Sequence, residues 1–548
     1  IAVSDHVWYG PSGIGIYKST DGGVTWNDTS LAFDFTDDIR IYYMSVDPND
    51  SQKMMVATSD GLYSTTDGFT TNMKINNLNC SQVHWKPNDS NTIYLGTGNG
   101  DFYRSTDAGA NFNLVTSFGS SFVRMAITES DSSLVYVSNN SNIYRSTDSG
   151  ASFSSNNALP ESNMVISFSP QDSDEIIVGN FEVHNSTNDG VDFNVITDWG
   201  GNNDLPLVHV DQRNVFINPL QNDLVYLCND GGLYTYNVVD DLFKDLSNGL
   251  QITQYYDIAT SQSNVNVVSG GSQDNGSMYR DSSGIWAELA PTGDGMNTEI
   301  DPRDENIIFW EYQLGDMRRF NGSNNTGISP PGESGNGAWE TPYRLDPSNP
   351  DRLIAGYDKV YESLDQGDNW TEISGDLAGG DLDHIAIAAS NGNRIYAVRG
   401  STIYVKDESS NNWTTKSAPS GTIADIEVDP NDMDRVFISY SGYSSGNKVY
   451  KSIDAGDNWT NMSGSLPNVP VGAFEIYEDL CNAYFVGTDQ GVYLWSVLDQ
   501  DWLEYGNLPN TRVTDIEIQY SSLKIRVGTH GRGIFEADIS VESCLVGA

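Results

Sequence analysis

Basic residues, cysteine and long apolar runs are scarce in this sequence, and each scarcity narrows what the protein can be. The 548 residues include 75 Asp and Glu but only 28 Lys and Arg, which gives a formal net charge of −47. A surface of that sign repels phosphate backbones and anionic membranes, so nucleic acid is not an expected partner. The charge indicates a solvated surface, with cation binding as the alternative interpretation.

Cysteine and histidine are too few and too scattered to indicate a metal site. The four cysteines are Cys80, Cys228, Cys481 and Cys544, and none forms a Cys-x-x-Cys pair. This argues against a zinc site and against a disulfide scaffold. No stretch approaches the roughly 18 apolar residues that span a bilayer, so we expect no membrane insertion. The chain starts without Met or a signal-like segment, and we expect a mature or trimmed chain.

One phrase recurs along the chain, with the pattern Ser-x-Asp-x-Gly-x-x-Trp/Phe. Five strict copies place the aspartate at Asp21, Asp107, Asp148, Asp365 and Asp454, and two weaker copies have Thr66 and Asn188 there. From residue 21 to residue 188 these positions are 45, 41, 41 and 40 residues apart. Such a period is typical of a four-stranded propeller blade.

A second marker precedes the phrase, namely a polar turn followed by an alternating strand such as TIYLGT or RVFISY. Both markers together give thirteen units, six before about residue 250 and seven after it. Because one propeller rarely exceeds about eight blades, we predict an all-β fold of two tandem β-propellers with about seven blades each. The boundaries are 1–250 for the first propeller, whose first blade is incomplete, 251–540 for the second, and 541–548 for a tail. As an alternative, the segment GIFEADIS completes the first blade.

These repeats resemble the Asp-box, or bacterial neuraminidase repeat, propellers over essentially the whole chain. That group includes sialidases, sortilin-type receptors and two-propeller xyloglucanases. The resemblance implies that each aspartate accepts backbone N–H groups in the turn between the third and fourth strands of a blade. It therefore gives a structural role to Asp21, Asp107, Asp148, Asn188, Asp365 and Asp454. It also implies an extracellular or cell-surface location, as in secreted bacterial proteins labelled glycosyl hydrolases.

Candidate catalytic residues come from the stretch between about 199 and 340, which is rich in Asp, Asn, Gln and Gly. This stretch lies at the expected junction of the propellers, and domain interfaces often form ligand clefts. A glycosidase needs two facing carboxylates. The first candidates are Asp230 in NDGG and Asp294 in TGDG, with Glu299, Glu311 and Asp316 as alternatives. In the xyloglucanases that the chain resembles, the catalytic aspartates likewise come from separate propellers. The competing interpretation is that these side chains only satisfy backbone groups in turns.

Candidate binding residues surround those carboxylates. The polar ones are His209, Asp211, Gln273, Asp274 and Asn275, and the aromatic ones are Trp199, Trp310, Tyr312 and Trp339. The aromatic residues lie outside the repeated phrase, so stacking on a sugar and packing between blades both remain open. Asp211, beside His209, is placed to orient an acid.

No cofactor is expected from the sequence. Calcium is an alternative at SGDLAGGDLDH, where Asp376, Asp381 and Asp383 crowd one loop without the spacing of an EF-hand. The sialidase reaction is disfavoured because the chain lacks Arg-Ile-Pro. The sequence GYSSG matches Gly-x-Ser-x-Gly, but no helix can follow it, so it does not predict a nucleophile elbow.

Two functions from different classes therefore stay open. The first is a recognition or scaffold protein that binds a polysaccharide or an extracellular protein partner. The second is a glycoside hydrolase that cleaves a plant- or algal-type polysaccharide with paired carboxylates. Propellers serve both functions, so the fold alone does not choose. We favour the first on sequence grounds, because no acid pair carries a specific motif.

Overall fold

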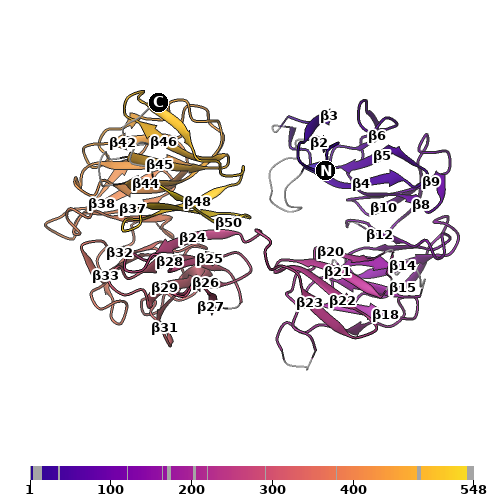
Figure 1. Ribbon diagram of the computed structural model, residues 1–548, viewed down its shortest axis with the longest axis horizontal. Helices are drawn as coiled ribbons and strands as arrows, with labels where there is room; N and C mark the ends of the chain where they lie inside the picture. Colours follow the sequence, from indigo (N-terminus) through magenta and orange to yellow (C-terminus); the bar gives the residue numbers. More distant parts are fainter. Residues whose placement is uncertain are drawn as a thin grey trace. The chain divides into compact units, whose positions relative to one another are not determined.

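The computed structural model describes residues 2–539, apart from 4–14, 35–36, 120, 163, 169–173, 202–204, 219, 222, 291, 378 and 478–482. The chain divides into two compact units, Ile1–Gly249 (unit 1) and Leu250–Ala548 (unit 2). In the described part, thirteen antiparallel sheets of three or four strands account for almost all regular structure. Each unit arranges its sheets in chain order around a centre (Figure 1).

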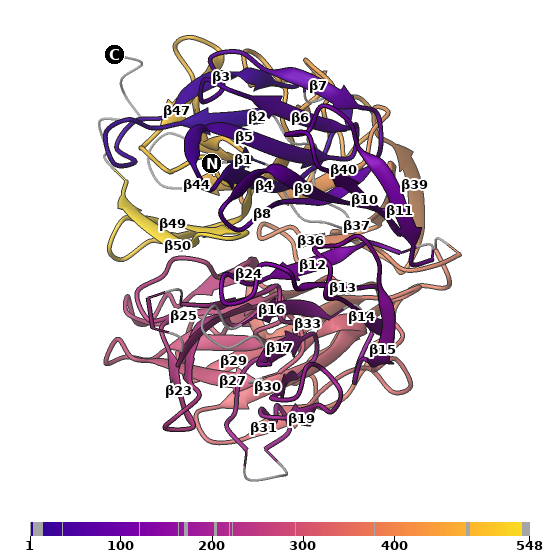
Figure 2. The same cartoon turned by 90° about the vertical axis from the view of Figure 1, so that its right-hand side faces the viewer.

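Unit 1 contributes six of these sheets, and its strands follow one another side by side in chain order, as β12 to β15 show (Figure 2). The first sheet is β1 (Ala2–Val3), β2 (Gly15–Lys18) and β3 (Asn27–Ala32). The next two are β4 (Ile41–Asp47), β5 (Asp50–Thr58), β6 (Leu62–Thr65) and β7 (Met73–Asn76), then β8 (Cys80–Lys86), β9 (Asp89–Thr97), β10 (Asp101–Ser105) and β11 (Asn113–Ser117). The fourth sheet is β12 (Arg124–Ile127), β13 (Val135–Ser138), β14 (Asn142–Ser146) and β15 (Ser154–Ala158). The fifth is β16 (Val165–Phe168), β17 (Ile176–Gly179), β18 (Val183–Ser186) and β19 (Asn194–Val195). The sixth is β20 (Asn214–Ile217), β21 (Leu224–Asn229), β22 (Gly232–Asn237) and β23 (Leu242–Asp245).

Unit 2 contributes the other seven sheets. The first is β24 (Tyr255–Thr260), β25 (Val268–Ser272), β26 (Ser277–Arg280) and β27 (Trp286–Ala290). The second is β28 (Gly295–Ile300), β29 (Ile307–Tyr312), β30 (Asp316–Asn321) and β31 (Asn325–Gly327). The third is β32 (Tyr343–Asp346), β33 (Asn349–Gly356), β34 (Val360–Ser363) and β35 (Thr371–Glu372). The next two are β36 (His384–Ile387), β37 (Ile395–Arg399), β38 (Thr402–Lys406) and β39 (Trp413–Ser417), then β40 (Ile423–Val428), β41 (Val436–Tyr440), β42 (Val449–Ser452) and β43 (Thr460–Asn461). The sixth sheet is β44 (Val471–Tyr477), β45 (Ala483–Thr488), β46 (Gly491–Ser496) and β47 (Asp501–Tyr505), and the seventh is β48 (Val513–Gln519), β49 (Lys524–Thr529) and β50 (Gly533–Asp538). The short 3-10 helix η2 (Gln313–Gly315) links β29 to β30.

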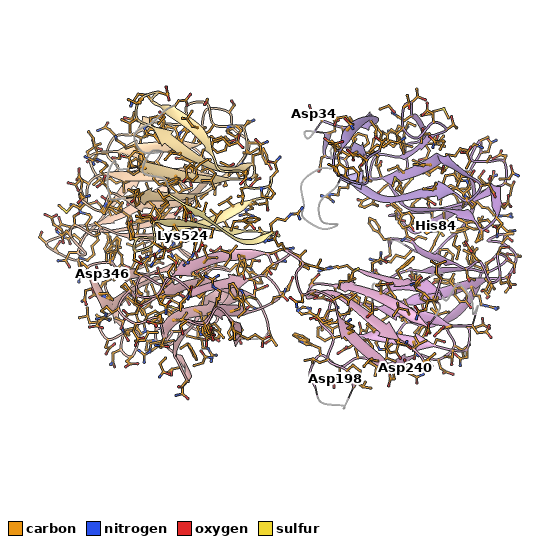
Figure 3. The ribbon with its side chains drawn as sticks, viewed as in Figure 1. Asp34, His84, Asp198, Asp240, Asp346 and Lys524 are labelled. Carbon is orange, nitrogen blue, oxygen red and sulfur yellow. The ribbon has the colours of Figure 1, made fainter. Side chains whose placement is uncertain are left out.

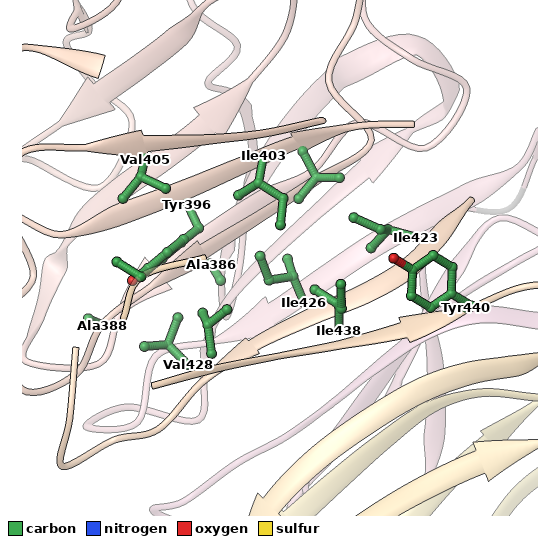
Figure 4. Packing of buried hydrophobic residues seen from close by; sticks show 13 residues of the cluster. Ala386, Ala388, Tyr396, Ile403, Val405, Ile423, Ile426, Val428, Ile438 and Tyr440 are labelled. Atoms are coloured by element: carbon green, nitrogen blue, oxygen red, sulfur yellow. The ribbon is translucent and has the colours of Figure 1, made fainter. Parts of the chain in front are cut away.

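The hydrophobic core lies between neighbouring sheets. Between the sheet β36–β39 and the sheet β40–β43, Tyr396 and Ile403 pack against Ile426 and Ile438 (Figure 4). All five residues of β41 are buried, because sheets cover both of its faces, whereas β43 at the sheet edge is exposed. Each fully buried Ile or Val side chain stabilises the fold by about 1.5–3 kcal/mol, so the repeated strands supply most of the stability.

The repeated phrase forms the turn between the third and fourth strands of a sheet. Between β10 and β11, Asp107 Oδ1 accepts hydrogen bonds from Ser105 Oγ at 2.8 Å and from Asn111 N at 2.9 Å. Gly109 takes a φ of 88°, a conformation that glycine adopts at little cost. One copy differs from the predicted register, since Thr65 and Asp67, rather than Ser64 and Thr66, make these bonds. The hydroxyl of Thr65 replaces that of serine, which hid the copy from the strict pattern.

Replacing one of these aspartates tests its role. Asp454 accepts hydrogen bonds from Ser452 Oγ at 2.9 Å and from the backbone and side chain of Asn458 at 2.8 Å. We expect D454A to lower the Tm of unit 2, because the turn then loses all three bonds. D454N should lower it less, since Asn188 fills the same place naturally and accepts a bond from Asp192 N at 3.0 Å. Scanning calorimetry of both variants measures this, and equal Tm values for wild type and D454A would contradict it.

The segment GIFEADIS does not complete the first sheet of unit 1, so that alternative is wrong. Residues 533–538 form β50, which pairs with β49 along its whole length. The last sheet of unit 2 lies against its first sheet, where Asp515 Oδ2 accepts a hydrogen bond from Ile258 N at 3.1 Å. Gln262 Nε2 donates to Ile518 O at 2.8 Å across the same seam. Polar contacts of this kind close the ring of sheets in unit 2.

Candidate functional site

The innermost strands of unit 2 all begin at one end of the unit, and the turns between second and third strands lie at that same end. Tyr255 at the start of β24 pairs with Ser272 at the end of β25, and Val471 at the start of β44 pairs with Thr488. The turns formed by the repeated phrase lie at the opposite end, because neighbouring strands are antiparallel. We call the first end the mouth face of unit 2.

Asp294 lies on the mouth face directly before β28, and it is only 8% exposed. Its Oδ1 accepts a hydrogen bond from the backbone N–H of Asp274 at 2.6 Å. Burial raises the pKa of Asp294, and the hydrogen bond from Asp274 offsets part of that rise. A carboxyl of this kind keeps its proton to higher pH than usual and can act as a proton donor. Asp274 itself has a φ of 60°, which is uncommon for a residue other than glycine and occurs often at functional sites.

Tyr256 connects Asp294 and Asp274 to the aromatic side chains of the mouth face. The side chain of Trp339 lies beside the hydroxyl of Tyr256, whose ring lies 5.7 Å from that of His530. Burial raises the pKa of Tyr256 to about 12, and the nearby carboxylates Asp294, Asp274 and Glu340 add to the rise. Trp339 is 52% exposed. An exposed indole beside carboxyls is the arrangement that sugar stacking requires.

The other predicted residues of this region lie close by. Gln273 and Asn275 flank Asp274 in the turn between β25 and β26, where Asn275 Nδ2 donates to Gln273 O at 3.0 Å. Tyr312 pairs with Gly295, next to Asp294, and its ring packs against Trp310 at 5.1 Å. The structure therefore brings Asp294, the turn around Asp274, Tyr312 and Trp339 together in unit 2.

Two of the predictions for this region are wrong. Trp310 is 2% exposed and donates from Nε1 to Asn325 Oδ1 at 2.9 Å, so it belongs to the core and cannot stack on a sugar. Glu311 is completely buried, so it cannot reach a substrate as a catalytic acid. Asp316, another alternative acid, is already engaged by Arg318 at 2.8 Å and by Ser334 Oγ at 3.2 Å. Trp310 and Glu311 are consecutive in β29, so their side chains point to opposite faces of the sheet. Both are buried because neighbouring sheets cover both faces.

A cavity of about 470 Å³ lies along the innermost strands of unit 2 and is lined by many carboxylates. Seven of its acidic side chains come from five strands: Asp257 in β24, Glu299 in β28, Asp425 and Glu427 in β40, Glu475 in β44, and Asp515 and Glu517 in β48. Arg344 Nε lies 3.9 Å from Glu299 Oε1, while Glu340 and Arg512 line the end at the mouth face. Glu299, an alternative acid in the sequence prediction, therefore belongs to the cavity wall.

Asp257, Asp425 and Asp515 each connect their own sheet to a neighbouring sheet. Asp257 Oδ2 accepts a hydrogen bond from Thr298 N at 2.7 Å, and Asp425 Oδ2 accepts one from Phe474 N at 2.8 Å. Asp515 does the same with Ile258 N where the ring closes. Each follows a shift of register in its strand, which turns the carboxylate toward the neighbouring sheet. In unit 1, Gln82 fills this place and accepts from Met125 N at 2.6 Å.

The remaining glutamates of the cavity make stability depend on pH. Burial raises the pKa of Glu299 to about 7 and that of Glu427 to about 8. An unfolded chain releases these protons near pH ~4.3, so above that pH the folded state binds more protons and its stability falls as pH rises. The turn aspartates act oppositely and only in acid, since hydrogen bonds, above all from Ser152, lower the pKa of Asp148 to about 2.

We therefore expect the Tm of unit 2 to be highest near pH ~5 and at least about 3 °C lower at pH ~8. Calorimetry at constant ionic strength measures this difference. E427Q cannot ionise, so it should make the difference smaller. A Tm that stays constant or rises over this range would contradict the prediction.

Unit 1 holds the other predicted residues. Asp230, in the turn between β21 and β22, forms a bidentate ion pair with Arg213, whose Nε lies 2.6 Å from Oδ1. Asp198, labelled in Figure 3, precedes Trp199, whose ring lies 4.7 Å from that of His209. His209 is buried, and Asp211 takes a φ of 61° in the turn that follows it. The side chains of Trp199 and His209 are therefore in contact.

No metal site emerges from the residues that the structure describes. No three His, Cys, Asp or Glu side chains within them group closely enough to hold an ion. Within the described residues, Asp376, Asp381 and Asp383 do not come together as a three-carboxylate group for calcium. Asp376 accepts from Gly379 N at 2.7 Å within its own loop, and Asp383 accepts from Gly400 N at 2.6 Å in the turn between β37 and β38. No helix in the described ranges has the length and apolar character that crossing a bilayer requires.

Sequence reasoning missed Glu340, Arg512 and Tyr256. Glu340 follows Trp339 directly, and that adjacency was the available signal. Tyr256 and Arg512 stand at the start of strands in otherwise ordinary repeats, so only the ring arrangement of unit 2 shows that they share one face.

Comparison with known proteins supports the fold. No protein-family profile and no curated protein matches the chain. Among solved structures, the chain is similar to an ancestral GH74 enzyme, with 16% identity and a TM-score of 0.58 over 96% of this chain and 95% of that one. It is also similar to the GH74 xyloglucanase from Xanthomonas campestris, with 14% identity and a TM-score of 0.52 over 98% and 89%. At these identities the similarity shows the fold: the chain is an all-β protein of two tandem β-propellers.

Proposed function

We propose that this protein is a glycoside hydrolase that cleaves a polysaccharide, with Asp294 as its proton donor. The observation that carries the proposal is the mouth face of unit 2, where a buried carboxyl of raised pKa lies in one polar group with Asp274, Tyr256 and the exposed Trp339. A hydrolase needs a protonated carboxyl at the leaving oxygen and an aromatic surface to hold the sugar. The enzymes that share the fold add support, since one of them is a xyloglucanase.

Asp294 protonates the glycosidic oxygen in this scheme, because it keeps its proton at a pH where an exposed aspartate has lost it. A second, ionised carboxylate then activates water or attacks the sugar carbon. Asp274 is a candidate for this role because it adjoins Asp294. Trp339 and Tyr312 bind the sugar rings.

The recognition function favoured on sequence grounds becomes the second candidate. The reason is that Asp294 of unit 2 supplies a protonated carboxyl, which catalysis needs and binding alone does not. A reducing-sugar release assay separates the two, with xyloglucan first and then other plant and algal polysaccharides. Release by the wild type supports the hydrolase. Retardation in an affinity gel with no release from any polysaccharide would show that the protein only binds.

A further inference from the structure

The loop between β31 and β32 carries the most exposed aromatic side chain of the mouth face. Residues 336–341 hold Trp339, which lies beside the Tyr256 hydroxyl, and Glu340, which lines the cavity together with Arg512. Both side chains are exposed, although the backbone that bears them is held on two sides. Gly337 N donates to Leu314 O at 3.0 Å, and Leu314 N donates to Trp339 O at 3.1 Å.

A second set of bonds fixes the end of this loop. Asn297 Nδ2 donates to Thr341 O at 2.8 Å, and Thr341 Oγ1 donates to Ala338 O at 2.9 Å. Leu314, which receives the other side of the loop, takes a φ of 64°. A strained residue persists only where its surroundings hold it, so the loop and the turn beneath it form one rigid element.

Glu311 lies under this loop, at a place where four other sheets have glycine. Gly96, Gly271, Gly487 and Gly528 each stand on the second strand opposite the bulge of the first strand. Glu311 occupies that place in β29, between Trp310, which pairs with Thr298, and Tyr312, which pairs with Gly295. Two further sheets have Ala57 and Ser439 there, so the protein keeps a large acid where the repeat elsewhere has a small residue.

The Glu311 carboxyl is completely buried and only half satisfied. Oε1 accepts a hydrogen bond from Thr341 N at 3.1 Å, whereas Oε2 has no hydrogen-bond partner among the described residues. Burial raises the pKa of Glu311 well above its usual value, with the charge of Glu340 adding to the rise and that of Arg344 opposing it. The hydroxyls of Tyr343 and Tyr357 lie in the same surroundings. Such a carboxyl costs stability, and costs of this kind are expected at functional sites.

We propose that residues 336–341 form a preset ligand-binding element, in which Trp339 and Glu340 contact the polysaccharide and Glu311 is the buried positioning residue that holds them. The proposal rests on the proposed function for its ligand. Its physical advantage is that a loop already fixed in the free protein loses little entropy on binding. Glu340 accepts or donates hydrogen bonds to sugar hydroxyls, while the Trp339 ring stacks on a sugar face.

The test compares E311G, which introduces the glycine found at the equivalent place in four other sheets, with the isosteric E311Q. Acrylamide quenching of Trp339 is measured without ligand, as the difference between each protein and the same protein carrying W339F. We expect E311G to increase this quenching and to weaken polysaccharide binding at least about 10-fold while the Tm stays the same or rises. E311Q should retain most of the binding, because its amide still accepts from Thr341 N.

Unchanged quenching and binding in E311G would overturn the proposal, as would wild-type binding by E340A, which we expect to bind at least about 10-fold more weakly. If E311G does not fold, E311Q and E340A still decide, because E311Q must resemble the wild type and E340A must not. If the wild type neither binds nor cleaves any polysaccharide, the proposed function fails, while the quenching result still judges the positioning role of Glu311.

Discussion

Asp294→Asn is expected to lower the rate of polysaccharide hydrolysis at least about 100-fold, because general acid catalysis by a positioned carboxyl contributes about 10²–10⁴. The asparagine keeps an oxygen that accepts from Asp274 N, so the turn and the Tm should change little. KM should also change little, since Trp339 and Tyr312 still hold the sugar. Both kcat and KM are obtained from initial rates, measured across pH, on the polysaccharide that the release assay identifies as substrate.

The pH profile adds a second readout. Activity of the wild type should fall as pH rises through the raised pKa of Asp294, because the deprotonated form cannot donate a proton. The residual activity of D294N should lack this fall. D316N is the matched control, because Arg318 and Ser334 already engage that carboxylate. If D294N retains more than about a tenth of the wild-type kcat, the assignment of the acid is incorrect.

Arg352→Ala is expected to lower the free energy of unfolding of unit 2 by about 3–5 kcal/mol, the usual result of removing one partner from a buried ion pair. Arg352 is buried and donates to Asp346 Oδ2 and to Glu362 Oε1, both at 2.7 Å. It also donates to Gly392 O, in the loop between β36 and β37, at 2.5 Å. Asp346, labelled in Figure 3, would be left buried and unpaired. Urea unfolding of the full chain measures the change.

Lys359→Ala is the control for this variant. Lys359 pairs with Glu372 at 3.5 Å in the same sheet, but both side chains are partly exposed, so the loss should stay under about 1 kcal/mol. The double variant R352M/D346L should recover part of the loss, because apolar residues of similar size often replace a buried ion pair without penalty. A loss under about 1 kcal/mol in R352A would show that water or a neighbouring residue compensates for the missing guanidinium.

The repeat phrase was sufficient to predict the fold because its information is local. The Ser-x-Asp-x-Gly phrase specifies one turn, and the alternating strands before it specify which face is buried, so each sheet can be read within about 45 residues. The single register error, at Thr65 and Asp67, arose where threonine takes the place of serine. The candidate site was predicted less well. Asp294 and Trp339 came from composition alone, and Trp310 and Glu311 were misread because exposure does not follow from composition.

The sequence by itself determined the all-β class, the repeat period, the strands and the turns that the aspartates close. These depend on residues close together in the chain. Only the tertiary structure decided which side chains meet on the mouth face, because Tyr256, Asp294, Trp339 and Arg512 come from different sheets. It also decided that Glu311 is buried under the loop of Trp339, since that follows from how one sheet packs against the next. Neighbour relations between sheets leave no local pattern, and the site therefore had to be read from the packing.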